Sequence, residues 1–177
     1  MWNRRNRLAR LAAVVALVSG LAFAASASAS ADADTTRTLS HFYDPGTEVV
    51  PSPITCDPGG MPIHGAATFG TEPGDEWIGT TTYDYCIYPQ TEPDWYSFTG
   101  TETLTGTVSS CGHTAGSMTW TQAGTFHTGT QDGGGQWQVI PGSGTGGLHG
   151  ARGGGTSTSF VSLALENYGY FSGWIHC

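Results

Sequence analysis

Glu102 is the residue of this sequence whose type and position best suit acid–base chemistry. From Tyr96 to Val108 the residues alternate between two sets, and Glu102 shares one set with Phe98 and Leu104 while threonines fill most of the other. Successive side chains of a β-strand point to opposite faces, so we expect the apolar set, and Glu102 with it, to face the core. Burial raises the pKa of a carboxyl group and suits it to general acid or base catalysis.

A structural role is the alternative interpretation of Glu102. The carboxyl group could lie near the mouth of a barrel and see water, or it could hold a hydrogen bond to Gln122 or to a tyrosine. Structural networks are the more common reason for a buried carboxylate, and both interpretations stay open on the sequence alone.

The same alternation places aromatic and amide side chains beside Glu102. It runs through residues 76–88 and 117–129, where apolar residues again share one parity and threonines the other. An apolar pocket with a few polar groups is typical of small-molecule sites, and a solid aromatic core is the alternative. If the protein is an enzyme, we expect Glu102, Tyr83 and Tyr85 to be the catalytic residues. The expected ligand contacts are Trp77, Phe98, Glu102, Trp120, Gln122 and Trp137.

The elements that must position these residues are β-strands. Helix signals are nearly absent after residue 31, and turn residues separate alternating stretches. Eight antiparallel strands can close into a barrel whose interior holds side chains or one small ligand, and a seven-stranded sandwich is the alternative. A proline-rich segment, residues 44–60, is expected to be a long loop. The expected strands are 38–43, 62–71, 76–88, 95–110, 117–129, 135–141, 154–165 and 168–177.

Four cysteines predict two disulfides, because an even count in an exported protein usually forms a disulfide framework. Three pairings are possible. In an up-and-down barrel, alternate turns lie at opposite ends, which places Cys56 with Cys86 and Cys111 with Cys177. We therefore prefer the pairs Cys56–Cys86 and Cys111–Cys177.

Two segments carry a resemblance to known families. One is the glycine-rich loop from Gly142 to Gly154, in which Leu148 is placed to plug a core, and the other runs from Thr99 to Val108. They resemble allene oxide cyclase barrels and plant dirigent proteins, and more closely an uncharacterised family of bacterial proteins with the same barrel fold. The resemblance implies an all-β, eight-stranded, antiparallel up-and-down barrel. The sequence shows no recognisable set of allene oxide cyclase catalytic residues, and a shared fold does not determine function.

Residues 1–31 have the pattern of a secretory signal peptide. Four arginines precede an apolar run at residues 11–23, and Ala-Ser repeats follow, with cleavage after Ala27, Ala29 or Ala31 equally compatible. The adjacent Arg4 and Arg5 leave twin-arginine export open as a second route. We expect residues 32–61 to supply a first strand and the cysteine loop, and residues 62–177 to complete a single barrel domain.

The charge of residues 32–177 excludes several classes of partner. Two arginines and no lysine stand against 14 acidic residues, a net charge of −12. Nucleic acid and anionic lipid require a basic surface, so we expect neither as a partner. No apolar run after the signal peptide is long enough for a membrane span, so membrane insertion is not expected. The sequence makes no prediction of oligomeric state.

Three functional hypotheses follow, and none involves a cofactor or a metal. The cysteines and histidines lack metal-ligand spacing, and no phosphate-loop or nucleophile-elbow motif occurs. The first hypothesis is a secreted barrel that binds a small, largely apolar molecule. The second is a cofactor-free cyclase or isomerase acting in the same cavity, and the third is a non-enzymatic extracellular interaction protein with a filled core.

Overall fold

The computed structural model describes residues 37–46 and 54–177. The expected signal peptide and part of the proline-rich loop lie outside the described residues. Among those described, the long strands are β1 (Arg37–Asp44), β2 (Met61–Phe69), β3 (Trp77–Pro89), β4 (Trp95–Val108), β5 (Gly116–His127), β6 (Thr130–Val139), β8 (Arg152–Val161) and β9 (Asn167–His176). Two short elements complete the order: the 3-10 helix η1 (Ser109–Cys111) and the strand β7 (Thr145–Gly146).

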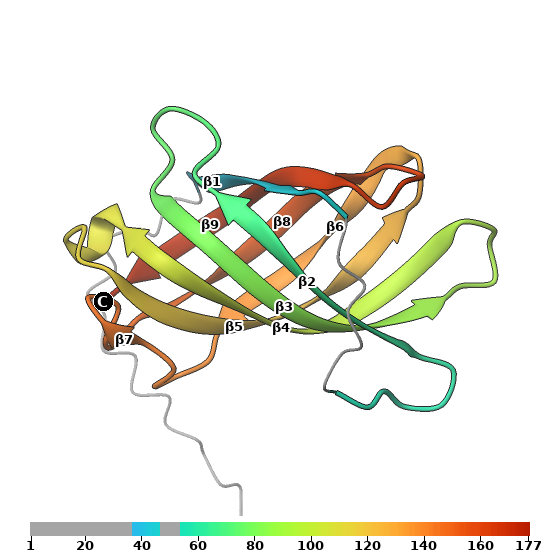
Figure 1. Ribbon diagram of the computed structural model, residues 1–177, viewed down its shortest axis with the longest axis horizontal. Helices are drawn as coiled ribbons and strands as arrows, with labels where there is room; N and C mark the ends of the chain where they lie inside the picture. The colour runs from blue at the N-terminus through green and yellow to red at the C-terminus, as the bar shows by residue number, and fades with distance from the viewer. Residues whose placement is uncertain (1–36, 47–53) are drawn as a thin grey trace, which may run out of the picture. The chain divides into compact units, whose positions relative to one another are not determined.

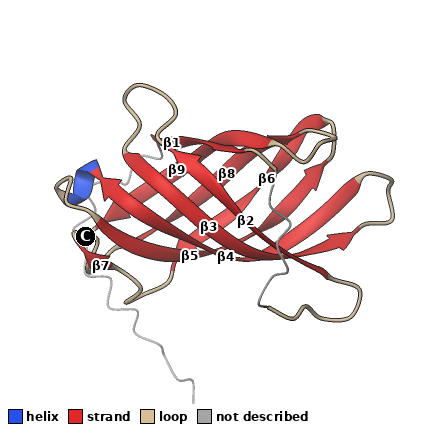
Figure 2. Ribbon diagram, viewed as in Figure 1, coloured by secondary structure: helices blue, strands red, loops and turns tan. Residues whose placement is uncertain are grey.

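The eight long strands form a closed antiparallel barrel. Each pairs with its neighbours in the chain, β7 aside, and β9 pairs back onto β1. Figure 1 shows the strands of this sheet curving around a common interior, and Figure 2 shows that strands make up nearly all of the regular structure. The expected all-β, eight-stranded up-and-down barrel is therefore confirmed.

Strand register explains why the alternation identified the inner face. Tyr83 lies opposite Glu102 on the β3–β4 pair, and Glu102 lies opposite Trp120 on the β4–β5 pair. Directly opposed residues share one face of a sheet. Glu102 and Trp120 are both buried, whereas Thr105 and Thr121, which have the opposite parity, are exposed.

The largest differences from the expected strands are the start of β6, the end of β8, which stops at Val161 rather than at residue 165, and the additional strand β7. The strand β6 begins at Thr130 rather than at residue 135, with a register shift between Thr130 and Gly133. Glycines in this segment weaken the alternation signal, because they carry no side chain that can mark a face. The two-residue β7, which pairs with the start of β5, was not expected, since two residues are too few to show a period.

One half of the barrel is filled by a core of large side chains. Trp77 and Trp120 are fully buried, with ring centroids 5.4 Å apart, and Trp77 lies 5.2 Å from Trp137. The side chain of Leu148, from the glycine-rich loop, is also fully buried in this core. A Cβ at Gly144 would overlap the carbonyl oxygen of Leu148, so glycine is needed there for the loop to fold back on itself.

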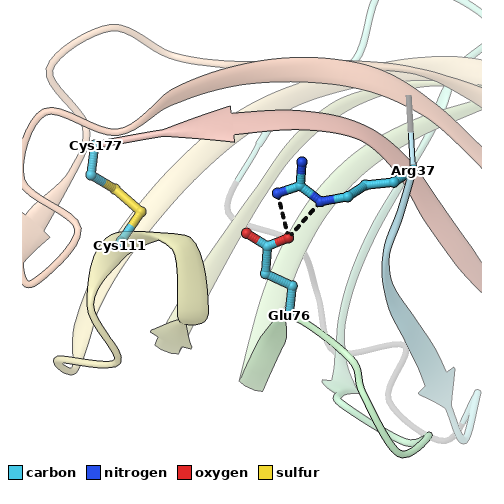
Figure 3. The surroundings of a disulfide bond; sticks show 4 residues. All are labelled: Arg37, Glu76, Cys111 and Cys177. Carbon is cyan, nitrogen blue, oxygen red and sulfur yellow. Dashed lines mark hydrogen bonds and ion pairs between the residues drawn. A yellow bond between two sulfur atoms is a disulfide. The ribbon is translucent and has the colours of Figure 1, made fainter. Parts of the chain in front are cut away.

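Both disulfides have the expected pairing. Cys56 bonds to Cys86 with Cα atoms 5.6 Å apart, and Cys111 bonds to Cys177 with Cα atoms 5.4 Å apart. Near the second disulfide, Arg37 donates two hydrogen bonds, of 3.1 and 2.8 Å, to one carboxylate oxygen of Glu76 (Figure 3). The disulfide Cys111–Cys177 ties the end of β9 to η1, which follows β4, at the packed half of the barrel.

Candidate functional site

The other half of the barrel contains a cavity of about 370 Å³. Its walls are mainly apolar, and the side chains that line it include Ile63, Ile87, Phe98, Phe126 and Val161. These residues lie on the parts of their strands farthest from Trp77 and Leu148, on the same side as the Cys56–Cys86 disulfide. The volume falls in the range of small-molecule binding sites.

A layer of polar side chains lies between the cavity and most of the packed aromatic core, which among the described residues reaches the cavity only through Phe42, Ala67 and Phe171. Glu102 and Gln122 line the cavity, and each lies two residues along its strand from a large core residue. That residue is Leu104 for Glu102 and Trp120 for Gln122. Ser157 of β8 completes the layer on the opposite wall. All three polar side chains are buried.

Hydrogen bonds connect this layer across four strands. Thr81 donates to Glu102 Oε1 at 2.6 Å, and Tyr85 Oη lies 2.8 Å from Glu102 Oε2. Tyr85 Oη also lies 2.9 Å from Gln122 Oε1, and Gln122 Nε2 donates to Ser157 Oγ at 2.7 Å. Buried polar groups need such partners, and here they form one continuous network.

A second carboxyl–tyrosine pair lies beside the first. Tyr83 donates its hydroxyl proton to Asp44 Oδ2 at 2.6 Å, and both residues line the cavity. The rings of Tyr83 and Tyr85 stack, with centroids 5.0 Å apart and planes 18° apart. Tyr83 lies opposite Gly65, and a Cβ at residue 65 would overlap the Tyr83 hydroxyl. The sequence therefore keeps the space for this ring free on the neighbouring strand.

The apolar surroundings change the acidity of all four groups. Burial raises the pKa of Glu102 from 4.5 to about 7, although hydrogen bonds from Thr81 and Tyr85 act in the opposite direction. Burial likewise raises the pKa of Asp44. The pKa values of Tyr83 and Tyr85 are raised first by burial and then by the neighbouring carboxylates. At neutral pH the cavity thus holds a carboxyl group that can give or take a proton and two tyrosines that stay protonated.

Comparison with known proteins identifies the family. The sequence profile of the family described as "Protein of unknown function (DUF3224)" matches residues 74–162, which is half of the chain. The chain belongs to the DUF3224 family. The matched region runs from just before β3 to the end of β8, so it contains Tyr83, Tyr85, Glu102, Gln122 and Ser157 and leaves out Asp44.

One solved structure from DUF3224 is similar to this chain. It is the crystal structure of a protein of unknown function from Shewanella oneidensis MR-1, with 17% sequence identity and a TM-score of 0.49. The alignment covers 81% of this chain and 99% of that one. A search of curated proteins gave no match.

The structure brings together five of the eight residues expected at the site. Tyr83, Tyr85, Phe98, Glu102 and Gln122 line the cavity. Trp77, Trp120 and Trp137 were expected to contact a ligand, but they lie in the packed half and do not line the cavity. At their level, large side chains from neighbouring strands meet and fill the interior.

Asp44 and Ser157 were not expected at the site. Asp44 has the parity of the buried Phe42 and lies on the same strand, but the following Pro45 and Gly46 predicted a loop from residue 44 onward. Ser157 lies on a strand with apolar residues at both parities, Phe160 and Val161, so alternation could not assign its face. A parity argument carried one residue past the expected end of β1 would have found Asp44.

Metal ligands and membrane helices were also sought. Among residues 37–46 and 54–177, no group of three or more His, Cys, Asp or Glu side chains is placed to hold a metal ion. No helix in the described part of the chain is long and apolar enough to cross a membrane.

Proposed function

We propose that this protein binds a small, largely apolar molecule inside its barrel. The observation that carries the proposal is the cavity of about 370 Å³, whose apolar walls end on the polar layer of Glu102, Tyr85, Gln122 and Ser157. Apolar walls would supply most of the binding free energy, and the few polar groups would orient the ligand. The hypothesis of an interaction protein with a filled core is not supported, because this half of the interior is hollow.

Mass spectrometry of co-purified molecules tests the proposal. Protein purified without detergent is extracted with organic solvent, and the extract is compared with that of the Ser159→Trp variant. Ser159 lines the cavity, so a tryptophan there would occupy it, whereas Thr158→Trp adds the same ring on the exposed outer face of β8. We expect an apolar compound from the wild type and from T158W that is missing from S159W. Equal amounts from all three proteins would contradict the proposal.

A second candidate function is a cofactor-free isomerisation or cyclisation in the same cavity. The observation that favours it is Glu102, a buried carboxyl group with a pKa of about 7 that lines the cavity. An isomerisation needs no net gain or loss of atoms, so one group that gives a proton and takes one back can serve it. In this mechanism Tyr85 assists by donating a hydrogen bond to the carboxylate. Unchanged turnover of an identified substrate by Glu102→Gln would exclude this role.

We also propose that DUF3224 shares its barrel architecture with allene oxide cyclases and dirigent proteins. The closed eight-stranded meander and the buried Leu148 of the glycine-rich loop support this relationship. A crystal structure of this protein whose strand order or strand tilt could not be superposed on an allene oxide cyclase barrel would contradict it.

We propose that the protein is exported and acts as a single domain of residues 32–177. The two disulfides support this location, because disulfides persist in oxidising compartments. Acidic residues outnumber basic ones, which supports the expectation of no nucleic-acid partner. Sequencing the N-terminus of secreted protein tests export: we expect it to begin at Ser28, Ser30 or Asp32, and an intact Met1 in the culture medium would contradict it.

A further inference from the structure

If Glu102 is ionised, the polar layer lacks one proton for the hydrogen bonds that its side chains form as they stand. Tyr85 Oη lies within hydrogen-bond distance of two acceptors, Glu102 Oε2 at 2.8 Å and Gln122 Oε1 at 2.9 Å. A phenol has one proton to donate, so it can satisfy only one of them. The second contact is a hydrogen bond only if the proton comes from the other side.

A protonated Glu102 satisfies every contact as the side chains stand. The carboxyl proton on Oε2 is donated to Tyr85 Oη, and Tyr85 donates to Gln122 Oε1. Gln122 Nε2 then donates to Ser157 Oγ at 2.7 Å. The hydrogen bonds run in one direction from Glu102 to Ser157, and the hydroxyl proton of Ser157 is left over.

An ionised Glu102 requires the opposite direction. Tyr85 must then donate to the carboxylate, and the Gln122 amide must turn over so that its nitrogen faces Tyr85 and its oxygen accepts from Ser157. The turned amide would place its NH₂ group toward Trp120 Nε1, which now lies 3.5 Å from Gln122 Oε1. The buried indole thus favours the present amide orientation, and with it the protonated carboxyl group.

The two directions give the cavity two different surfaces at Ser157. Ser157 lines the cavity, and no acceptor for its hydroxyl proton lies among the described residues when Gln122 donates to it. With Glu102 protonated, Ser157 therefore offers a donor to the cavity. With Glu102 ionised, its proton is used by Gln122 and it offers only lone pairs.

We propose that the ligand is an apolar molecule with a carbonyl oxygen at its buried end, which accepts a hydrogen bond from Ser157 when Glu102 is protonated. This inference rests on the proposed binding function and names its ligand class. A ketone, aldehyde or ester oxygen can only accept, so it fits the protonated arrangement and is repelled by the ionised one. An alkane or alkene of the same shape does not distinguish the two.

The titratable groups that face this network determine the pH at which it reverses. On β3 these are Tyr83 and Tyr85, and on β1 it is Asp44, whose charge raises the pKa of Glu102 further. His64 of β2, which pairs with Asp84, and Tyr96 of β4 also line the cavity. The elements β5 and β8 contribute only the uncharged Gln122, Trp120 and Ser157. With a pKa of about 7, Glu102 changes state in a range where both forms can be studied.

A matched pair of ligands tests the inference. Methyl heptyl ketone and the alkene in which a CH₂ group replaces its oxygen are titrated against the neutral fluorophore N-phenylnaphthylamine bound to the wild-type protein. We define the ketone preference as the affinity for the ketone divided by the affinity for the alkene, and we expect it to be about fivefold higher at about pH 5 than at about pH 9, the worth of one hydrogen bond. A ketone preference that does not change with pH would overturn the inference.

Three variants assign the effect to the network. Ser157→Ala should lower the ketone preference at about pH 5 to the value that the wild type has at about pH 9. Glu102→Gln should keep it at both, because its amide donates to Tyr85 at every pH. Thr158→Val removes a hydroxyl from the exposed face of the same strand and should behave as the wild type does. A ketone preference retained in S157A would also overturn the inference.

The outcomes separate this inference from the function on which it rests. If neither the fluorophore nor either ligand binds, the binding function itself is wrong. If all three bind and the ketone preference is the same at every pH, binding stands and the role of Ser157 is wrong. The comparison in the wild type needs no variant, so a variant that fails to fold does not decide the question.

Discussion

Tyr85 of β3 reaches diagonally to Glu102 on the neighbouring strand β4, with 2.8 Å between its hydroxyl oxygen and a carboxyl oxygen. The residue directly opposite Tyr85 is Gly100, while Glu102 lies opposite Tyr83. Because Gly100 has no side chain, the ring of Tyr85 can lie over that position and approach the carboxyl group from the side. This contact joins the apolar cavity to the polar layer.

Stability should fall as pH rises toward neutrality. Glu102 binds its proton more tightly in the folded state, so the stability it confers is complete below pH 4.5 and is lost as pH rises to about 7. The shift corresponds to roughly 3 kcal/mol in the free energy of unfolding. Urea denaturation at a series of pH values measures this fall. Glu102→Gln should reduce the fall, leaving the part due to Asp44, whose pKa is raised in the same direction. An identical fall in E102Q would contradict the assignment.

Gly65→Ala should displace Tyr83 from Asp44. A methyl group at residue 65 would overlap the tyrosine ring, and such overpacking costs about 1–3 kcal/mol. Denaturation of the single variants and of the G65A/Y83A double variant gives the coupling between the two sites. We expect the double variant to be less destabilised than the sum of the two single variants. Additive losses would show that the methyl group clashes with something other than Tyr83.

Leu148→Ala should destabilise the barrel through the packed half, because Leu148 does not line the cavity. Leu148 is fully buried in the packed half, and truncation of such a residue costs about 3–5 kcal/mol through lost burial and the void that remains. Leu163→Ala is the matched control, because Leu163 is 82% exposed and its loss should change stability by less than about 0.5 kcal/mol. Equal effects of the two substitutions on the urea midpoint would refute the role of the glycine-rich loop as an anchor.

Removing the disulfide between Cys111 and Cys177 should lower the free energy of unfolding by about 2–5 kcal/mol. The bond closes a long stretch of chain, with 66 residues of sequence separation, and so restricts the unfolded chain strongly. Denaturation of the C111S/C177S variant under oxidising conditions measures the loss. Reducing this variant should lower its free energy of unfolding further, by the contribution of Cys56–Cys86 alone. Unaltered stability in C111S/C177S would show that this disulfide does not form.

The inner face of the barrel was predictable where side chains alternate without interruption. Glu102, Tyr85 and Gln122 follow from period-two patterns and from the rule that opposed residues share a face. The disulfide pairs followed from strand direction alone. The assignment of the inner face succeeded because β4, β5 and most of β3 have threonine on one face and apolar residues on the other.

The division of the interior into a packed half and a hollow half was not predictable in the same way. Period two tells which face a side chain joins, but it does not tell how far along the barrel the large side chains meet. Trp77, Trp120 and Trp137 share the inner face with Glu102, yet they fill the opposite half. Asp44 and Ser157 were missed because a proline-glycine turn and an ambiguous strand hid their parity.

Saturation binding of a neutral apolar fluorophore is the most direct test of the central claim that the barrel interior binds a ligand. N-phenylnaphthylamine is titrated into the wild type, S159W and T158W. The two variants carry the same added ring on the inner and the outer face of β8, respectively. We expect one binding site per chain in the wild type and in T158W, and at least about a tenfold loss of affinity in S159W, since a filled cavity offers no apolar surface. Equal binding by all three proteins, or binding by none of them, would contradict the claim.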